Sequence, residues 1–152
     1  MLDRREMLAR SAAVAGLMAS AGLLPASALA AWSAPAFEAR SLAELVKALG
    51  VGAPVDSRDV TVSGPDIAEN GAVVPVGAAC TLAGVKRLLI LVEKNPAVLA
   101  AAFDVSDAVE ANFLTRVKMN QSSNVIAVAL MADGKVFFSE KDVKVTLGGC
   151  GG

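Results

Sequence analysis

The chain has 152 residues, a formal net charge of −1 and no histidine. Without histidine, Ser-His-Asp and Cys-His catalysis, imidazole acid–base chemistry and histidine-ligated metals are excluded. Two cysteines are too few for a four-ligand structural zinc site, and no basic block suggests a nucleic-acid partner. Composition therefore argues against a self-sufficient enzyme and against a resident cofactor or metal.

The first 30 residues have the features of an export signal. Arg4-Arg5 precede a mildly apolar run at about residues 11–24, and Ala28-Leu29-Ala30 is a small-residue cleavage site. The run is shorter and less apolar than the roughly 20 residues that a membrane-spanning helix needs. The pattern predicts a cleavable signal peptide over residues 1–30 and no membrane span. The paired arginines favour the twin-arginine route, which would place the mature chain in the periplasm.

One segment of the mature chain has the periodicity of an amphipathic helix. Its apolar residues recur with i, i+3, i+4, i+7 spacing at Leu42, Leu45, Val46 and Leu49. Ser41 and Glu44 are spaced as a capping box, and Gly50 is a natural C-terminal stop. We expect one helix at about residues 37–49.

After this helix the sequence changes to short β-branched runs separated by turn residues. The runs predict strands at residues 60–62, 72–80, 85–92, 112–119, 125–131, 135–139 and 143–147. Pro75 lacks an N–H, which favours an edge or a bulge for its strand. Asp133-Gly134 is typical of a hairpin turn. About seven closely spaced strands predict an all-β domain over residues 31–147, an antiparallel sandwich of the immunoglobulin-like kind.

Two of the expected strands are apolar on both faces, at residues 88–92 and 125–131. Phe137-Phe138 likewise place a ring on each side of their strand. Because an antiparallel sheet commonly has one solvated face, a second layer must cover the other face of these strands. The helix at 37–49 covers part of it; loops of the same chain or a partner subunit cover the rest.

The chain ends in five residues, Gly148, Gly149, Cys150, Gly151 and Gly152, in which only the cysteine has a side chain. Glycine has the widest conformational freedom, so residues 148–152 are predicted to be a flexible arm. Residues 148–150 extend on the order of 10 Å beyond the sheet at about 3.5 Å per residue. No cation adjoins Cys150 in the sequence to favour its thiolate. The pattern suits a thiol on which other enzymes act.

Several segments of the mature chain resemble those of a known family. Four segments carry the resemblance, in order along the mature chain from near Phe37: Leu91-Val92-Glu93-Lys94-Asn95-Pro96, Thr115-Arg116-Val117-Lys118-Met119, Ala132-Asp133-Gly134-Lys135, and Val143-Lys144-Val145-Thr146-Leu147 followed by Gly148-Gly149-Cys150-Gly151-Gly152. They look like SoxY, the sulfur-carrier subunits of the bacterial thiosulfate-oxidation (Sox) system. The terminal pentapeptide is the most specific of them.

The resemblance implies a non-catalytic carrier that pairs with a SoxZ-like β-sandwich subunit and holds sulfur intermediates on Cys150. In the family these are processed by a haem protein that loads thiosulfate, a hydrolase that releases sulfate and a sulfur dehydrogenase. No cofactor of those enzymes is expected to bind this chain.

Two other functions and the role of Cys80 remain open from the residues. The Gly151-Gly152 carboxylate could be the carrier group, as in ubiquitin-related proteins, although the export signal argues against ATP-dependent activation. The chain could instead be an exported adhesion or binding module that dimerises through Cys150. Cys80, which departs from the family pattern, is interpreted as a small buried apolar residue, with a disulfide to Cys150 or a transient redox role as the alternatives.

Overall fold

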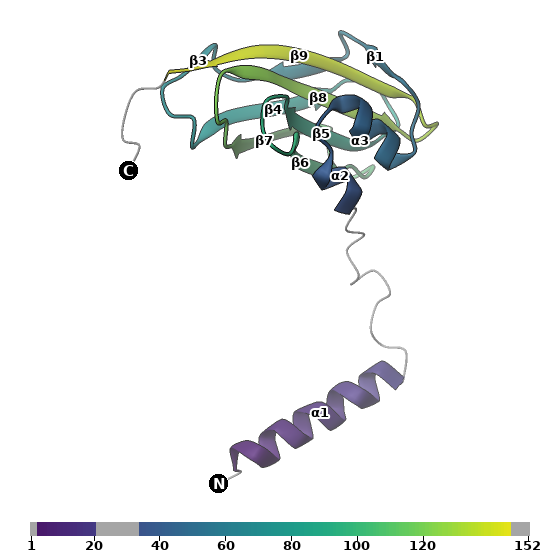
Figure 1. Ribbon diagram of the computed structural model, residues 1–152. Coiled ribbons are helices and arrows are strands. Elements are labelled where there is room, and N and C mark those ends of the chain that lie inside the picture. Colours follow the sequence, from purple (N-terminus) through teal and green to yellow (C-terminus); the bar gives the residue numbers. More distant parts are fainter. Residues whose placement is uncertain (1–2, 21–33, 147–152) are drawn as a thin grey trace. The chain divides into compact units, whose positions relative to one another are not determined.

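The computed structural model describes residues 3–20 and 34–146 and is shown in Figure 1. The chain divides into two compact units, Met1–Trp32 and Ser33–Gly152. In the first unit, helix α1 spans Arg4–Ser20 within the predicted signal peptide. Among the described residues, no helix has the length and apolar character needed to cross a membrane.

Within residues 34–146, the second unit contains two β-sheets and two short helices (Figure 1). The strands are β1 (Pro54–Asp56), β2 (Val60–Ser63), β3 (Ile67–Ala68), β4 (Val74–Cys80), β5 (Val85–Val92), β6 (Leu99–Asp104), β7 (Asn112–Val117), β8 (Ser123–Met131) and β9 (Val136–Val145). The larger sheet has the order β1-β9-β8-β5-β6, with β3 also paired to β9, and the smaller has the order β2-β4-β7. β1 and β3 run parallel to β9. The predicted all-β fold is confirmed.

The expected single helix is two helices, α2 (Ala34–Glu38) and α3 (Leu42–Leu49). They are separated because Ser41 has an extended backbone and caps α3, with its Oγ accepting from the Glu44 N–H at 3.1 Å. The Glu44 carboxylate accepts from the N–H of Arg40 at 2.8 Å. Gly50 ends α3 in the left-handed conformation, with φ 66°, as its position in the sequence predicts.

The two helices cover the second face of the larger sheet. Towards the smaller sheet, β5 and β8 bury Leu88, Ile90, Val92, Val125, Ala127 and Ala129. Towards the helices, they bury Leu89, Leu91, Ile126, Val128 and Leu130 against Ala36, Ala39 and Leu45. Phe137 and Phe138 pack on opposite sides, one with each core. The strands that are apolar on both faces are thus covered by this chain's own helices.

The prediction that Pro75 marks an edge or a bulge is wrong. β4 is the central strand of the smaller sheet, and its register with both neighbours is regular. The N–H of Cys80 points to the β7 side, where it donates to the Ala111 carbonyl, so by alternation the nitrogen of Pro75 faces β2. The β2 ladder ends at Ser63↔Gly77, before Pro75. The missing N–H of Pro75 therefore faces the β2 side of β4, at a position where β2 has already ended.

The strands predicted at 135–139 and 143–147 are one strand, β9, ten residues long. Glu140, Lys141 and Asp142 continue the ladder opposite Ile126, Val125 and Asn124, respectively, rather than forming a turn. The sequence pattern also missed β6, because its Leu-Ala-Ala-Ala-Phe-Asp segment has weak β-propensity and was not separated from the loop after Pro96. β1 and β3 were missed because they are only three and two residues long.

Candidate functional site

The predicted site residues Gly148, Gly149, Cys150, Gly151 and Gly152 lie outside the described residues. The structure does describe the strand that leads to them, up to Thr146. We call Val145 and Thr146 the arm root. In Figure 1 the end of β9 lies beside β3.

The pairing between β8 and β9 ends before the C-terminal end of β9. The last pair of their ladder is Ser123↔Val143, so β8 gives the arm root no regular strand partner. Ser122 takes the place of that partner. Its Oγ accepts a hydrogen bond from the N–H of Val145 at 2.9 Å and lies 3.4 Å from the carbonyl oxygen of Val145, to which it donates. One half-buried hydroxyl thus satisfies both backbone groups of Val145 on this edge.

The short strand β3 holds the opposite edge of β9. Its residues pair in parallel register, Ile67 with Lys144 and Ala68 with Val145. The carbonyl oxygen of Ala68 accepts from both the N–H and the Oγ1 of Thr146, at 3.0 and 3.4 Å. These bonds fix the arm root from the second side.

An ion pair between Asp66 and Lys141 connects the segment before β3 to β9. Lys141 Nζ lies 2.7 Å from Asp66 Oδ1, and the Asp66 carbonyl accepts from the N–H of Lys144. The hydrogen bond from Lys141, followed by its positive charge, lowers the pKa of the Asp66 carboxyl. Because Asp66 is exposed, this pair is screened by solvent and contributes weakly to stability.

Gly71 packs against the arm root so closely that it leaves no room for a side chain. A β-carbon at position 71 would lie 2.5 Å from the Met119 carbonyl oxygen and 2.9 Å from Val145 Cγ1. The backbones of Gly71 and Met119 are joined by an N–H···O bond of 2.7 Å. The Asn70-Gly71 turn thus packs tightly on the end of β9.

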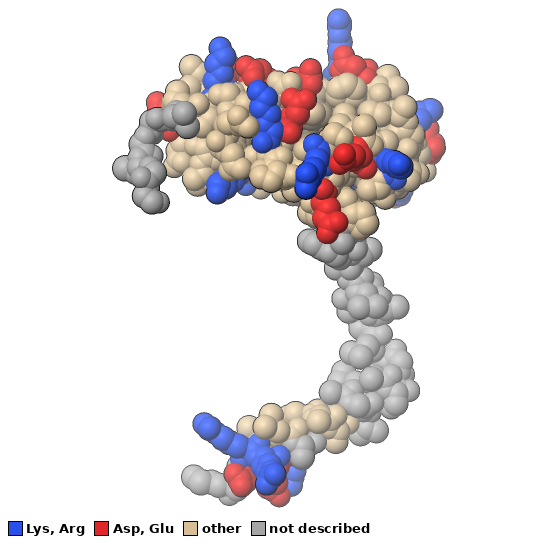
Figure 2. All heavy atoms as spheres, viewed as in Figure 1, with Lys and Arg blue, Asp and Glu red and all other residues tan. Residues whose placement is uncertain are grey.

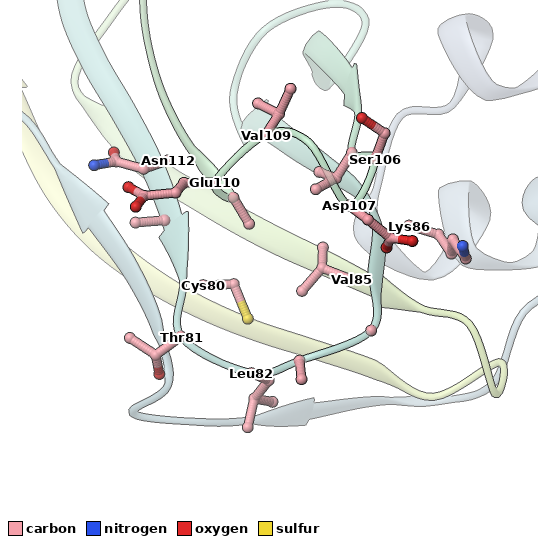
Figure 3. A pocket seen from close by; sticks show the side chains of 15 residues that line it. Cys80, Thr81, Leu82, Val85, Lys86, Ser106, Asp107, Val109, Glu110 and Asn112 are labelled. Carbon is pink, nitrogen blue, oxygen red and sulfur yellow. The ribbon is translucent and has the colours of Figure 1, made fainter.

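The remaining cysteine, Cys80, lies in a different environment. It is the last residue of β4, is 9% exposed and belongs to the core between the sheets. It lines a pocket of about 420 Å³ between the loops that follow β4 and β6, and Figure 3 shows its sulfur near Leu82 and Val85. Burial, the largest influence, raises the pKa of its thiol. A protonated, buried thiol fits the prediction of a small apolar residue and is a poor sulfur nucleophile.

The arm root lies beside one end of the smaller sheet, and Cys80 lies at the other end of that sheet. Val145 contacts Gly71, just before β4, whereas Cys80 is the final residue of that strand. β4 has seven residues and spans about 20 Å. The chain from Val145 to Cys150 covers at most about 17 Å. This reach is shorter than β4, and the sulfur of Cys80 is buried, so the geometry disfavours a Cys80–Cys150 disulfide.

Charges of both signs are interspersed over the face of the β-domain that Figure 2 shows. Within residues 3–20 and 34–146, no group of three or more His, Cys, Asp or Glu side chains is arranged to hold a metal ion. No sequence pattern pointed to the roles of Gly71 and Ser122. The hydroxyl and its partner are 23 residues apart and meet only in the folded sheet.

Comparison with known proteins adds a family match. Residues 46–150 match the model of the family described as sulfur oxidation protein SoxY. The sulfur carrier protein SoxY from Chlorobium limicola f. thiosulfatophilum has 30% sequence identity and a TM-score of 0.59, covering 66% of this chain and 93% of that protein. The superoxide reductase (neelaredoxin) from Ignicoccus hospitalis has 13% identity and a TM-score of 0.52, covering 59% and 81% of the two chains. The second likeness is one of fold alone. No curated protein matches the chain.

Proposed function

The chain belongs to the SoxY family, and on this basis we propose that it is a periplasmic sulfur carrier that holds thiosulfate-derived sulfur covalently on Cys150. The family match extends through residue 150 and therefore includes this cysteine. The sulfur-carrier role follows from family membership. The attachment residue, the compartment and the sequence of partners are the proposed parts.

The burial of Cys80 is the observation that supports the choice of Cys150. The chain has two cysteines, and the thiol of Cys80 is buried with a raised pKa. A sulfur carrier needs a thiol that partner enzymes can reach and deprotonate. Cys150 has only glycine neighbours in the sequence, which leave space around its sulfur. It is therefore the better attachment point.

Loading of this thiol is an oxidation. The Cys150 thiol and thiosulfate together release one proton and two electrons, and a bond forms between the cysteine sulfur and the outer sulfur of thiosulfate. A haem enzyme of the Sox system accepts the electrons. Water then cleaves the bond to the sulfonate group in a partner hydrolase, which releases hydrogen sulfate and leaves a cysteine persulfide. The carrier supplies the thiol and its presentation, and each partner supplies its own catalyst.

A SoxZ-like subunit completes the proposed assembly. It would bind the β-domain, while the haem protein, the hydrolase and the sulfur dehydrogenase make transient contacts. In this proposal the sheets and helices of residues 34–146 serve as the body that these partners recognise.

The proposal is tested with the mature chain purified from thiosulfate-grown cells of its host. Intact mass spectrometry before and after reduction should show sulfane or sulfonate adducts, which peptide mapping places on Cys150. Cys150→Ser should lose both the adducts and thiosulfate-dependent growth. If Cys150→Ser abolished only a disulfide-linked dimer and left thiosulfate oxidation intact, an exported binding module would replace the carrier.

A further inference from the structure

The arm root is held by groups that do not belong to the main β8–β9 ladder. We propose that Ser122 is a positioning residue, whose hydroxyl fixes the end of β9 and so sets the point from which Cys150 is presented to partner enzymes. This inference rests on the proposed function of Cys150 and identifies how this chain controls the reach of that thiol.

The hydroxyl lies at the point where the main sheet stops supporting β9. Beyond the Ser123↔Val143 pair, the β8 side of Val145 is contacted through Ser122 Oγ, at 2.9 Å from the nitrogen and 3.4 Å from the carbonyl oxygen. Replacing Ser122 with alanine removes both hydrogen bonds. The N–H and the carbonyl oxygen of the half-buried Val145 would then have to bond to water instead. The last residues of β9 would then keep strand pairing only with the two-residue strand β3.

Loosening this end adds residues to the segment between the fixed part of β9 and the thiol. With the root fixed, Thr146 to Cys150 gives a reach of about 14 Å; with β9 opened back to Val143, the reach is about 25 Å. For a flexible glycine-rich chain, the effective concentration of its end falls with about the −3/2 power of length. Going from four to seven residues therefore lowers the effective concentration of the thiol in a docked partner by about twofold.

The chain offers a matched control in Ser57. This serine is also half-buried and also makes side-chain hydrogen bonds with a nearby residue, accepting from the Asp59 N–H at 3.2 Å. It follows β1, which pairs with the first residues of β9 and is therefore at the opposite end of that strand from the arm root. Ser57→Ala removes a comparable bond without touching Val145.

The first measurement is amide hydrogen exchange on the mature chain. Ser122→Ala should raise the exchange rate of the Val145 amide about fivefold, the effect of one lost hydrogen bond, while Ser122→Thr, which keeps the hydroxyl, should stay near the wild-type rate. Ser57→Ala should leave Val145 exchange unchanged. An unchanged rate in Ser122→Ala would overturn the proposed anchoring.

The second measurement compares two reactions of Cys150. Ser122→Ala should lower kcat/KM for loading with thiosulfate by the host's haem enzyme about twofold or more, with recovery in Ser122→Thr. The rate of Cys150 with the small reagent DTNB should stay within the error of wild type, because that reagent needs no docking. Equal losses in both reactions, no loss in loading, or the same loss in Ser57→Ala would each contradict the positioning role.

A separate variant tests the underlying function. If Cys150→Ser still supports loading, the proposed carrier thiol is wrong whatever the behaviour of Ser122. If Cys150→Ser abolishes loading and Ser122→Ala leaves it unchanged, the carrier stands and the positioning role fails.

Discussion

Gly71 and Val145 are in such close contact that a β-carbon on Gly71 would lie 2.9 Å from Val145 Cγ1. The same β-carbon would lie 2.5 Å from the carbonyl oxygen of Met119, which is backbone and cannot rotate away. The turn at residues 70–71 and the end of β9 can therefore pack together only if residue 71 is glycine.

Gly71→Ala should lower the free energy of unfolding by about 1–3 kcal/mol, the usual effect of overpacking. Gly64→Ala is the matched control, because its nearest contact, at 3.4 Å from the Pro75 carbonyl oxygen, is ordinary. That variant should stay within about 0.5 kcal/mol of wild type. Urea denaturation measures both. Equal stability of the two variants would mean that the turn moves away from β9 without cost.

Leu45 connects the helices to the larger sheet. It is fully buried on α3 in the core with Leu89 and Val128. Leu45→Ala should destabilise the domain by about 2–5 kcal/mol through a cavity between these layers. Lys47→Ala, on an exposed position of the same helix, should change stability by less than about 0.5 kcal/mol. A small effect of Leu45→Ala would show that the helices do not form an integral layer of the fold.

The Asp66–Lys141 pair should make stability depend on pH in the acid range. The pKa of Asp66 is lowered in the folded chain from its ordinary value of 3.8 by the hydrogen bond and charge of Lys141, so the carboxylate stabilises the fold above that value. The contribution is lost as pH falls through the lower, folded pKa. Asp66→Asn should therefore be less stable than wild type at neutral pH and equal to it at strongly acid pH.

Salt provides the control for this pair. Because Asp66 is exposed, the difference between wild type and Asp66→Asn should shrink at 1 M NaCl. Chemical denaturation across pH and salt gives both comparisons. A difference that persists at strongly acid pH would show that the asparagine acts on the backbone of the segment rather than through charge.

Cys80 should behave as a buried thiol with an alkaline effect on stability. Its pKa is raised above the ordinary thiol value of 9.0, chiefly by burial, so the unfolded chain loses this proton at a lower pH than the folded chain. The stabilising contribution is therefore present below about pH 9 and is lost as the pH rises through the folded pKa. Cys80→Ala should show a smaller loss of stability than wild type between pH 8 and pH 10.

Thiol labelling gives a second readout for Cys80. In the native chain DTNB should react rapidly with one thiol per chain and with the second only after denaturation. The fast thiol should vanish in Cys150→Ser and persist in Cys80→Ala. Fast labelling of both cysteines in the native chain would contradict the burial of Cys80.

The parts of the fold that the sequence predicted are those that depend on local chemistry. The cap at Ser41, the stop at Gly50 and the hairpin turn at Asp133-Gly134 act within a few residues, and each is present in the structure. The faces of β7 also follow its alternation, with Val117 buried and Leu114 exposed. These elements could be predicted from the local sequence without knowledge of the rest of the fold.

The errors arose where distant residues decide the structure. The place of Pro75 in a central strand depends on where β2 ends, and the continuity of β9 through Lys141 depends on pairing with β8. The anchoring role of Ser122 requires the end of β9 to lie beside it. None of these pairings follows from local propensity, because each is set by the register of the folded sheets.

Sulfur attachment to Cys150 is tested by intact mass of the mature chain from thiosulfate-grown cells, with peptide mapping to locate any addition. We predict sulfane or sulfonate sulfur on Cys150, removable by reduction, and an unmodified Cys80. A bare Cys150 under all thiosulfate-oxidising conditions, or sulfur attached to Cys80 instead, would contradict it.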